Sequence, residues 1–473
     1  MLPSVNTKII ATLGPASSSK EKLEALLESG VNVFRLNFSH GTYDFFKETI
    51  ASIREISKSR NVDIPIIQDL QGPKIRLNLF TNEQKVNTGD TLTLSLCAHV
   101  DDNVDKVCVT YPGLNNEVKK GQRILIDDGN IELNITDISN DQIQTIVKKG
   151  GTLKPRKGVN LPDTKLSLPS LTEKDIKDLE FGASQKVDYV ALSFVRSHKD
   201  ILELKHYLKT FKLGAGVIAK IEKPEALTDI DAIVEACDAI LLARGDLGVE
   251  INLEQVPTAQ KKVIEVCRVK KVPIIIATQM LETMTNNPVP TRAEVTDVYQ
   301  AVSDGADAVM LSGETAVGKY PAETVQMMKK IIMESEKNLS AFCSTRATEL
   351  SSNTDEAIAE MSAQITNKIN AKFICSFTYS GWTARLLSKT NTHRPIIAFT
   401  TLDNTKRKIS LYRVVKALHI GNSIDDIDRL IETANSELKK MGLANAGDKI
   451  VIVAGHPLGK GGATNLLKVH TIV

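Results

Sequence analysis

The chain has 473 residues, of which 42% are hydrophobic and 4% aromatic, and its formal net charge at pH 7 is +2. This length predicts two to four domains with sizeable cores. The near-neutral charge gives no electrostatic reason to expect nucleic acid or a membrane surface as a partner, and the few aromatic residues argue against a stacking surface. No apolar run approaches the length of a membrane span.

Six cysteines are scattered along the chain without a C-x-x-C motif or a pairing pattern. Cys237, Cys267 and Cys375 lie in apolar stretches, so we expect reduced core thiols of a cytoplasmic protein. We also expect no signal peptide, because Lys8 and a predicted strand at Ile9–Leu13 begin the fold at once.

Strands and helices alternate from the start of the chain. Ser17, Ser18 and Ser19 precede a predicted helix that stops at Gly30, where glycine favours the end of a helix. The first three strands are predicted at residues 7–13, 31–39 and 64–70, with helices at 20–29 and 42–59. This alternation ends at Gly72-Pro73.

Residues 74–160 have a different pattern, in which short alternating segments are separated by turns rich in Gly, Asn and Asp. The predicted strands are 91–96, 106–109, 123–126, 131–135 and 142–147. Strands at this spacing predict a small all-β domain inserted in the chain, which we expect to be a β-barrel lid domain.

The alternation resumes after Pro162 with five further strands, at residues 188–195, 216–222, 239–243, 273–277 and 308–311. Helices are predicted at 172–185, 198–210, 224–236, 253–270, 292–303 and 321–338. Eight βα units predict an α/β protein with a (β/α)8 TIM barrel formed by residues 1–73 and 161–340. A doubly wound open sheet is the alternative. Residues 345–353 read as a linker, and residues 350–473 predict a separate C-terminal α/β domain.

Charged residues end two neighbouring strands of the predicted barrel. Lys220 and Glu222 share one face of their strand, and Asp246 follows the next strand. Two carboxylates beside an ammonium suggest a divalent-metal site, and a buried salt bridge is the alternative. Because active sites of TIM barrels lie at the carboxyl ends of the strands, the position favours the metal site.

Other strand ends carry further polar groups. Arg35, Asn37 and Ser39 alternate along the second strand, and a guanidinium flanked by an amide and a hydroxyl suits a phosphoryl group. Asp69 could orient Arg35 or bind a cation. Arg76 opens the predicted lid and could move with it.

The remaining polar groups leave alternatives open. Arg244 could clamp a carboxylate or phosphate, or form a salt bridge with a helix. Thr278 offers a hydroxyl to the same mouth, but a threonine at the end of a strand does not by itself indicate a functional site. The chain has no Ser-His-Asp order, no H-E-x-x-H and no phosphate-binding P-loop motif. In the last domain, Gly381 and the run Lys460-Gly461-Gly462 could hold phosphate.

Many separate segments together resemble one family, pyruvate kinase, over essentially the whole chain. The matching segments are Thr7–Pro15, Arg35–Gly41, Asp69–Arg76, Gly158–Pro162, Ala219–Pro224, Ala243–Gly248, Ala277–Met284, Pro290–Val295 and Met310–Pro321. The resemblance implies phosphoryl transfer between phosphoenolpyruvate and ADP, giving pyruvate and ATP. It also implies a (β/α)8 barrel, an inserted β lid and a C-terminal regulatory domain.

The resemblance assigns roles to residues at the barrel mouth. Glu222 and Asp246 would bind Mg²⁺ or Mn²⁺, and Lys220 and Arg35 would stabilise the transferring phosphoryl group. The pyruvate pocket would be lined by Ala243, Arg244, Gly245, Asp246 and Thr278, with Thr278 close to the enolate carbon that is protonated. The nucleotide would contact Asn37, Phe38, Ser39, His40, Arg76 and Lys157. Glu314 matches an acidic residue of the mouth whose role stays open.

One departure from the family pattern concerns K⁺. Many members have Thr and Glu where this chain has Leu70 and Lys74. The side chain of Leu70 cannot coordinate a cation, and the ammonium of Lys74 could replace K⁺ in the region of Asn37, Ser39 and Asp69. The chain therefore resembles the K⁺-independent branch, and we expect no K⁺ requirement.

Regulation and assembly rest on the resemblance alone. The loop with Thr378, Ser380, Gly381 and Thr383 resembles an effector-phosphate loop, although Trp382 departs from the usual pattern, so we expect a sugar phosphate or AMP or no effector at all. A homotetramer is implied. A metal-dependent lyase of phosphoenolpyruvate or pyruvate, and a non-catalytic regulatory paralogue, are the alternative functions.

Overall fold

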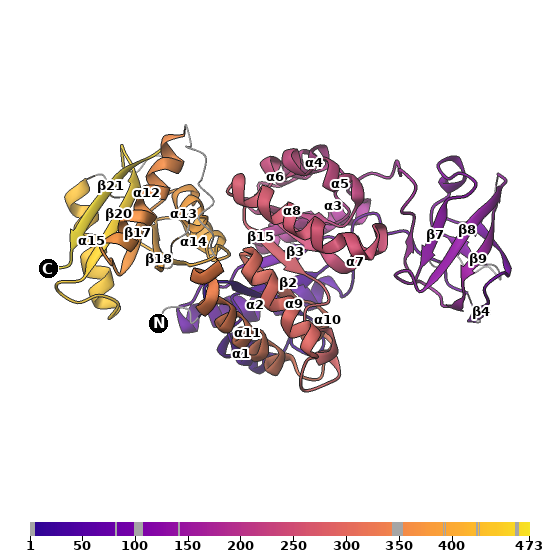
Figure 1. Cartoon of the computed structure of the whole chain (residues 1–473), viewed down its shortest axis with the longest axis horizontal. Helices are drawn as coiled ribbons and strands as arrows, with labels where there is room; N and C mark the ends of the chain where they lie inside the picture. The colour runs from indigo at the N-terminus through magenta and orange to yellow at the C-terminus, as the bar shows by residue number, and fades with distance from the viewer. Residues whose placement is uncertain are drawn as a thin grey trace.

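The computed structural model describes residues 5–80, 83–98, 107–140, 142–342, 353–390, 392, 394–421, 424, 426–458 and 463–473. Three sheet systems follow one another along the long axis of the molecule (Figure 1). A small β-sheet domain lies at one end, a closed barrel in the middle and a five-stranded sheet with its helices at the other end.

The middle unit is a closed barrel of parallel strands in the order β1-β16-β15-β14-β13-β12-β3-β2. This closure confirms the predicted TIM barrel and rules out the open doubly wound sheet. The strands are short, apolar and fully buried for most of their length, as expected when helices cover a parallel sheet. They are β1 (Lys8–Leu13), β2 (Val33–Asn37), β3 (Ile66–Asp69), β12 (Tyr189–Leu192), β13 (Gly216–Ile221), β14 (Ala239–Ala243), β15 (Ile274–Ala277) and β16 (Ala308–Leu311).

Alternate side chains of these strands enter two different cores. Ile9, Phe34 and Leu36 point outward and pack with the helices. Ile10 and Ile67 point into the barrel, where they share a core cluster that continues into the C-terminal domain. The helices that follow the strands are α1 (Lys20–Ser29), α2 (Tyr43–Arg60), α3 (Glu173–Gln185), α4 (His198–Thr210), α5 (Pro224–Thr228), α6 (Ile230–Ala236), α8 (Val256–Val269), α9 (Arg292–Asp304) and α11 (Pro321–Phe342).

Side-chain caps explain why several helices begin where the sequence predicts. Ser19 accepts a hydrogen bond from the backbone of Lys22, and Thr172 forms a reciprocal capping box with Asp175. The predicted helix at residues 224–236 is wrong in one respect, because Asp229 divides it into α5 and α6. The predicted helix at residues 253–270 begins as the 3-10 turn η2 (Leu253–Gln255).

Two short helices at the barrel mouth escaped prediction. The helix α7 (Arg244–Glu250) begins directly after β14, and α10 (Gly313–Ala316) begins just after β16. Their residues carry the Gly and charged side chains that we expected in loops. Asp246 therefore lies on a helix and not on an extended strand end.

The inserted unit contains a six-stranded sheet and a two-stranded ribbon. The predicted strands 91–96 and 123–126 are confirmed, whereas the three-residue strands β4 and β10 were missed. The elements are β4 (Gln84–Val86), β5 (Thr91–Leu96), β6 (Cys108–Val109), η1 (Leu114–Asn116), β7 (Arg123–Ile126), β8 (Ile131–Ile138), β9 (Gln142–Lys149), β10 (Gly151–Leu153) and β11 (Val159–Asn160). The chain divisions at residues 73, 160 and 340 stay predictions.

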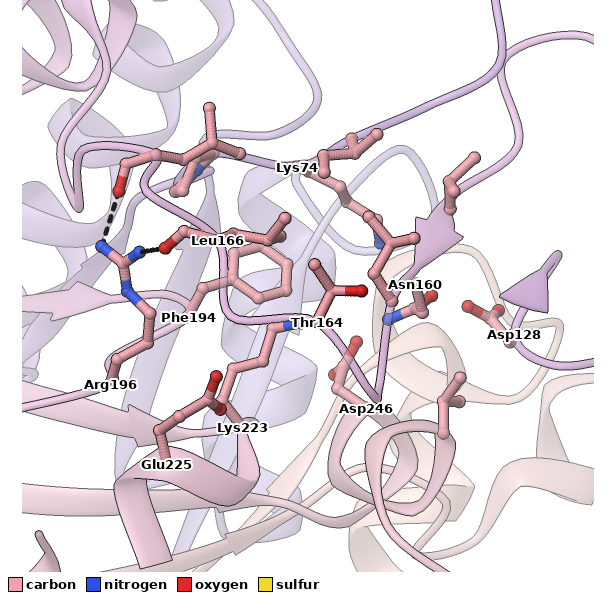
Figure 2. A pocket seen from close by; sticks show the side chains of 16 residues that line it. Lys74, Asp128, Asn160, Thr164, Leu166, Phe194, Arg196, Lys223, Glu225 and Asp246 are labelled. Atoms are coloured by element: carbon pink, nitrogen blue, oxygen red, sulfur yellow. Dashed lines mark hydrogen bonds between the residues drawn. The ribbon is translucent and has the colours of Figure 1, made fainter. Parts of the chain in front are cut away.

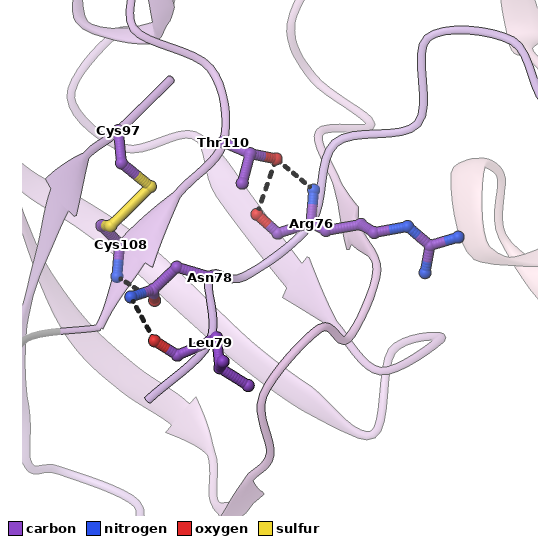
Figure 3. The surroundings of a disulfide bond; sticks show 6 residues. All are labelled: Arg76, Asn78, Leu79, Cys97, Cys108 and Thr110. Carbon is purple, nitrogen blue, oxygen red and sulfur yellow. Dashed lines mark hydrogen bonds between the residues drawn. A yellow bond between two sulfur atoms is a disulfide. The ribbon is translucent and has the colours of Figure 1, made fainter. Parts of the chain in front are cut away.

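A disulfide joins Cys97 to Cys108 in the inserted sheet (Figure 3). The sequence showed no pairing pattern, yet these two cysteines pair, because β5 and β6 run side by side and the two Cα atoms lie 5.9 Å apart. The sequence separation of 11 residues gave no hint of that pairing. Cys237, Cys267 and Cys375 are free and buried, as expected.

The C-terminal unit is a five-stranded sheet in the order β19-β18-β17-β20-β21 with helices packed on it. Its elements are α12 (Thr354–Lys368), β17 (Phe373–Phe377), α13 (Trp382–Ser388), β18 (Ile396–Thr400), α14 (Asp403–Ile409), β19 (Val415–His419), α15 (Ile427–Lys440), β20 (Lys449–Gly455) and β21 (Thr464–Thr471). The α/β alternation expected for this domain is confirmed. The expected linker at residues 345–353 lies outside the described residues except for Asn353, which caps α12, and the Lys460–Gly462 run also lies outside them.

Polar contacts fasten this unit to the end of the barrel opposite the active face. Asp188 pairs with Arg407 at 2.6 Å and with Arg54 at 2.8 Å, and Asp188 is fully buried. The hydroxyl of Tyr189 donates to the carbonyl of Lys408 at 2.9 Å.

Within the described part of the chain, no helix is both long and apolar enough to cross a membrane.

Candidate active site

A continuous network of buried charges lies across the carboxyl ends of β2, β3 and β13. The Nε atom of Arg35 lies 2.6 Å from Asp69, whose other carboxylate oxygen lies 3.3 Å from the ammonium of Lys220. Lys220 also pairs with Glu222 at 2.9 Å. The predicted groups thus lie together, and they form buried salt bridges of the kind expected in the alternative interpretation.

Ser193 belongs to this network and was missed in the sequence. The ammonium of Lys220 donates to its hydroxyl at 2.7 Å, and the hydroxyl donates to the carbonyl of Leu70 at 2.7 Å. Ser193 is 3% exposed and follows β12 directly. The signal that could have found it is a hydroxyl at the end of an apolar strand, the same signal that identified Thr278.

Burial and charge together set the protonation of this network. Burial opposes the charged form of Lys220, but Asp69 and Glu222 outweigh it and raise the pKa of Lys220. Burial likewise opposes ionisation of Asp69, and Lys220 and Arg35 still lower the pKa of Asp69. Burial raises the pKa of Glu222, and the nearby negative charge of Asp246 raises it further. Carboxylates that repel each other in this way favour a bound cation between them.

The oxygen atoms of Glu222 and Asp246 suit a hard cation such as Mg²⁺ or Mn²⁺. Glu222 is 1% exposed and its second oxygen accepts a hydrogen bond from the backbone N–H of Phe194 at 2.8 Å, which orients the carboxylate. Among the residues that the structure describes, no group of three or more His, Cys, Asp or Glu could hold a metal ion. A cation here would therefore take its remaining ligands from substrate and water, as Mg²⁺ commonly does.

Thr278 and Gly245 meet at the ends of β14 and β15. The backbone N–H of Gly245 donates to the Thr278 hydroxyl at 2.6 Å, and that hydroxyl donates to the Ala277 carbonyl at 2.6 Å. Thr278 has a positive φ of 66°, a conformation that L-residues rarely adopt. A side chain at position 245 would come within 3.2 Å of the Thr278 hydroxyl, so glycine allows the close approach.

The guanidinium of Arg244 pairs with helix α9 and also donates to the carbonyl of Thr278 at 3.3 Å. Its guanidinium forms two bonds of 2.6 Å to the carboxylate of Asp297 on α9, and it contacts the sulfur of Met280 at 2.9 Å. This bidentate pair is the salt-bridge alternative for Arg244. Contact with substrate at this position would have to use the backbone.

The end of β2 presents a mixed set of groups. The Asn37 side chain accepts a hydrogen bond from the backbone N–H of Ser39 at 3.1 Å. His40 is exposed, whereas Phe38 is 2% exposed and stacks on Phe46 with ring centroids 4.0 Å apart. The side chain of Phe38 therefore packs in the core, and only its backbone could reach a nucleotide.

Three cations surround His40. Although His40 is exposed, nearby protein atoms remove part of the water around its ring and so lower the pKa of His40, and the positive charges of Arg76, Lys74 and Arg35 lower it further. Arg76, Lys74 and Arg35 thus bring positive charge near His40, although Arg35 is paired with Asp69. Such a cationic region is suited to phosphate groups.

The inserted domain holds Arg76 by its backbone and leaves the guanidinium directed outward (Figure 3). The Arg76 N–H donates to the hydroxyl of Thr110 at 2.9 Å, and that hydroxyl donates to the Arg76 carbonyl at 3.0 Å. The guanidinium donates to the carbonyl of Arg156 at 3.2 Å. Lys157 pairs with Asp127 at 2.7 Å, so it would have to leave that partner to reach a nucleotide.

A pocket separates the inserted domain from the barrel mouth. Lys74, Asp128, Asn160 and Asp246 line it, together with the ring of Phe194 (Figure 2). Both the proposed metal ligand Asp246 and the proposed K⁺ substitute Lys74 therefore border one cavity.

Two other predicted positions have partners of their own. Leu70 is 1% exposed and its side chain belongs to the core between strands and helices. Glu314 is fully buried and accepts hydrogen bonds from the backbone N–H groups of Ser312 at 2.7 Å and Leu281 at 3.2 Å. Glu314 therefore fastens two strand-end loops together, which gives this residue a structural role.

The loop before α13 is internally bonded. The N–H of Gly381 donates to the hydroxyl of Thr378 at 3.0 Å, and Thr383 bonds to Thr464 at 2.8 Å. The indole N–H of Trp382 donates to Asp355 at 2.9 Å. The hydroxyl of Ser380 accepts a hydrogen bond from the backbone N–H of Trp382 at 3.4 Å.

These features define a TIM-barrel enzyme with a charged strand-end site facing an inserted β-domain. Models of the pyruvate kinase barrel domain and of the pyruvate kinase alpha/beta domain match residues 4–325 and 356–470. The pyruvate kinase of Bacillus licheniformis is 43% identical over 98% of this chain and 80% of its own length, and that of Geobacillus stearothermophilus is 42% identical with the same coverage. A crystal structure of a pyruvate kinase from Cryptosporidium parvum superimposes with a TM-score of 0.88 at 33% identity, covering 99% of this chain and 97% of the other. The chain belongs to the pyruvate kinase family.

Proposed function

We propose that this enzyme, a phosphotransferase of the pyruvate kinase family, transfers the phosphoryl group of phosphoenolpyruvate directly to ADP. Lys220 and Arg35 stabilise the negative charge of that group during the transfer. The bond between phosphorus and the enol oxygen breaks, a bond to the terminal oxygen of ADP forms, and the enolate carbon then takes a proton to give pyruvate. The observation that carries this proposal is the buried network of Arg35, Asp69, Lys220 and Glu222 at the barrel mouth.

Phosphoryl transfer depends on positioning and charge neutralisation more than on covalent help from the protein. Lys220 is held charged by Asp69 and Glu222, and Arg35 is fixed by Asp69 and by the hydroxyl of Thr12 at 2.9 Å. Both cationic side chains are thus held in position before the substrate binds, so they need little rearrangement during the reaction.

Glu222 and Asp246 would hold Mg²⁺ or Mn²⁺. When bound, this cation supplies charge neutralisation for the carboxylate and enol oxygen of the substrate. The backbone of residues 243–246 would bound the pyruvate pocket, with Thr278 placed to exchange a proton with the enolate carbon. The strain at Thr278 is consistent with a functional position.

The nucleotide would lie between the barrel and the inserted domain. The cationic region of Arg35, Lys74 and Arg76 around His40 supports this placement. Asn37, Ser39 and the backbone of Phe38 border the same region at the end of β2, and Lys157 would contribute after leaving Asp127.

We also propose that Lys74 replaces K⁺, so that the enzyme needs no monovalent cation. The Leu70 side chain lies in the core, and the Lys74 ammonium forms no ion pair with the described residues. A sugar-phosphate or AMP effector at Thr378, Ser380, Gly381 and Thr383, a homotetramer and a cytoplasmic location complete the proposal and rest on family resemblance.

The test is pyruvate formation coupled to lactate dehydrogenase, with phosphoenolpyruvate, ADP and Mg²⁺ each omitted in turn. We expect turnover only when all three are present. Consumption of phosphoenolpyruvate or pyruvate that does not depend on ADP and forms no ATP would indicate a lyase. No turnover in the complete mixture would indicate a non-catalytic paralogue.

The Lys220→Met variant tests the assigned residue. We expect it to abolish phosphoryl transfer, with a loss of at least about a hundredfold in kcat, because a buried charge at the transferring group is removed. Mn²⁺ binding, followed by electron paramagnetic resonance, should persist because Glu222 and Asp246 remain. Near-normal turnover would show that the role given to Lys220 is wrong.

A further inference from the structure

Three elements of the molecule converge on one buried carboxylate, that of Glu250. Its Oε1 atom accepts a hydrogen bond from the side-chain amide of Asn160 at 2.7 Å and pairs with the ammonium of Lys223 at 2.6 Å. The Glu250 side chain is 2% exposed and that of Lys223 is 13% exposed. Bonds between charged groups in such dry surroundings are strong, and losing one partner is costly.

Each partner belongs to a different part of the site. Asn160 is the last residue of β11, the edge strand of the inserted sheet, where it pairs with Leu125 of β7. Lys223 directly follows Glu222, and Glu250 ends the short helix α7, on which Asp246 lies one turn earlier. The Glu250 carboxylate therefore links the inserted sheet to both segments that carry the proposed metal ligands.

The pocket between the two domains lies beside this link. Asn160, Lys223 and Asp246 all line it, together with Lys74 and Asp128 (Figure 2). A shift of β11 would change the distance between the inserted domain and the strand ends across this pocket.

We propose that Asn160, Glu250 and Lys223 form a latch that sets the position of the inserted domain over the carboxylates of Glu222 and Asp246. This inference rests on the proposed function, since it concerns how the two halves of that site are brought together. The three are positioning residues, because they act through the segments that they join. Breaking the latch lowers the fraction of molecules in which Arg76 and the strand-end groups face the same substrate.

An isosteric exchange tests the latch. Asn160→Asp puts a second carboxylate against Glu250, and like charges at hydrogen-bonding distance repel. The double change Asn160→Asp with Glu250→Gln restores one carboxylate, one amide and the hydrogen bond between them, with the roles of donor and acceptor exchanged. Asn116→Asp, at an exposed position of the inserted domain, is the matched control.

Two measurements are made on the full chain. In the coupled assay, Asn160→Asp should lower kcat/KM for ADP about tenfold, and the double variant should recover most of that loss. Hydrogen exchange of backbone amides at residues 159–168, measured without substrate, should speed up in Asn160→Asp and return toward wild type in the double variant. Thermal unfolding verifies that all variants are folded.

The outcomes separate this inference from the proposed function. An Asn160→Asp enzyme that matches the Asn116→Asp control in both measurements, or a double variant no better than the single one, overturns the latch. A wild-type protein without turnover overturns the proposed function, and the exchange rates at residues 159–168 then decide the latch by themselves.

Discussion

Single residues at the barrel mouth are defined by their partners. Lys220 has Asp69, Glu222 and Ser193 as neighbours, so its position is fixed in three directions. A freely rotating lysine would lose conformational entropy each time it met the phosphoryl group. In the role proposed for Lys220, the network would remove that cost from the reaction, which is the physical meaning of preorganisation.

Ser193→Ala tests how much this fixation contributes. The variant removes one hydrogen bond to a charged group and leaves both carboxylates, so kcat should fall about tenfold while the fold is kept. Steady-state kinetics with phosphoenolpyruvate measures this. Ser184→Ala, which removes an exposed hydroxyl from α3, should match wild type. An unchanged kcat in Ser193→Ala would mean that the carboxylates alone position Lys220.

Lys74→Glu tests the proposed K⁺ independence. Wild type should show no large rise in rate when K⁺ is added to an assay free of sodium and ammonium. The variant should lose about tenfold or more in activity there, since a positive charge near the phosphates becomes negative, and K⁺ should restore part of it. Lys165→Glu makes the same charge change at an exposed position and should have little effect. Strong activation of wild type by K⁺ would contradict the proposal.

At the scale of elements, the segment that carries Arg76 is held by hydrogen bonds to residues in and next to the short strand β6. β6 has only the residues Cys108 and Val109, and the disulfide ties it to the end of β5. The segment with Arg76 is bonded to Thr110, and the N–H of Cys108 donates to the Asn78 side chain at 2.9 Å. The disulfide thus stabilises the platform on which Arg76 is mounted (Figure 3).

Cys97→Ser should therefore destabilise the inserted domain. A closed loop of this sequence separation, 11 residues, corresponds to about 3 kcal/mol in the chain-entropy account. Hydrogen exchange of β5 and β6 measures the loss, and we expect faster exchange there with the barrel unchanged. Wild type treated with dithiothreitol should behave like the variant. Equal exchange in oxidised and reduced wild type would contradict the expectation.

At the scale of the whole molecule, contacts between the barrel and the C-terminal domain contribute to the stability of the fold. Lys8 lies at that junction, 3% exposed, and its ammonium donates to the carbonyl of Val415 at 2.8 Å. Burial lowers the pKa of Lys8 to about 8, although the charge of Glu336 acts in the opposite direction. Keeping this lysine charged therefore opposes folding at neutral pH.

This pKa predicts a rise in stability with pH. The unfolded chain keeps the Lys8 proton up to about pH 10, whereas the folded protein releases it near pH 8, so the unfolded state binds more protons between these values. The contribution of Lys8 to the free energy of unfolding should increase by up to about 3 kcal/mol from pH 8 to pH 10.

Urea unfolding of wild type and Lys8→Met across this range measures the effect. The difference between their midpoints should change with pH in favour of wild type as the pH rises. Because other groups titrate equally in both proteins, they cancel in the comparison. A difference that stays constant from pH 8 to pH 10 would show that Lys8 titrates alike in the folded and unfolded states.

The amino-acid sequence determined the barrel, its strand count and the residues at its mouth. Alternating apolar strands and capped helices are local signals, and parallel strands bring their carboxyl ends to one face whatever the details. Charge at the ends of apolar strands was therefore enough to select Arg35, Lys220, Glu222 and Asp246 as candidate site residues, and their roles stay predictions.

The tertiary structure decided what depends on contacts between distant segments. The disulfide of Cys97, the bond from Ser193 to Lys220 and the meeting of Asn160 with Glu250 join residues whose separation along the chain carries no local signal. The two short helices α7 and α10 contradict local preference, because packing at the barrel mouth outweighs weak propensities. Such pairings follow from closing the barrel and seating the inserted sheet on it, and a pattern along the sequence does not contain them.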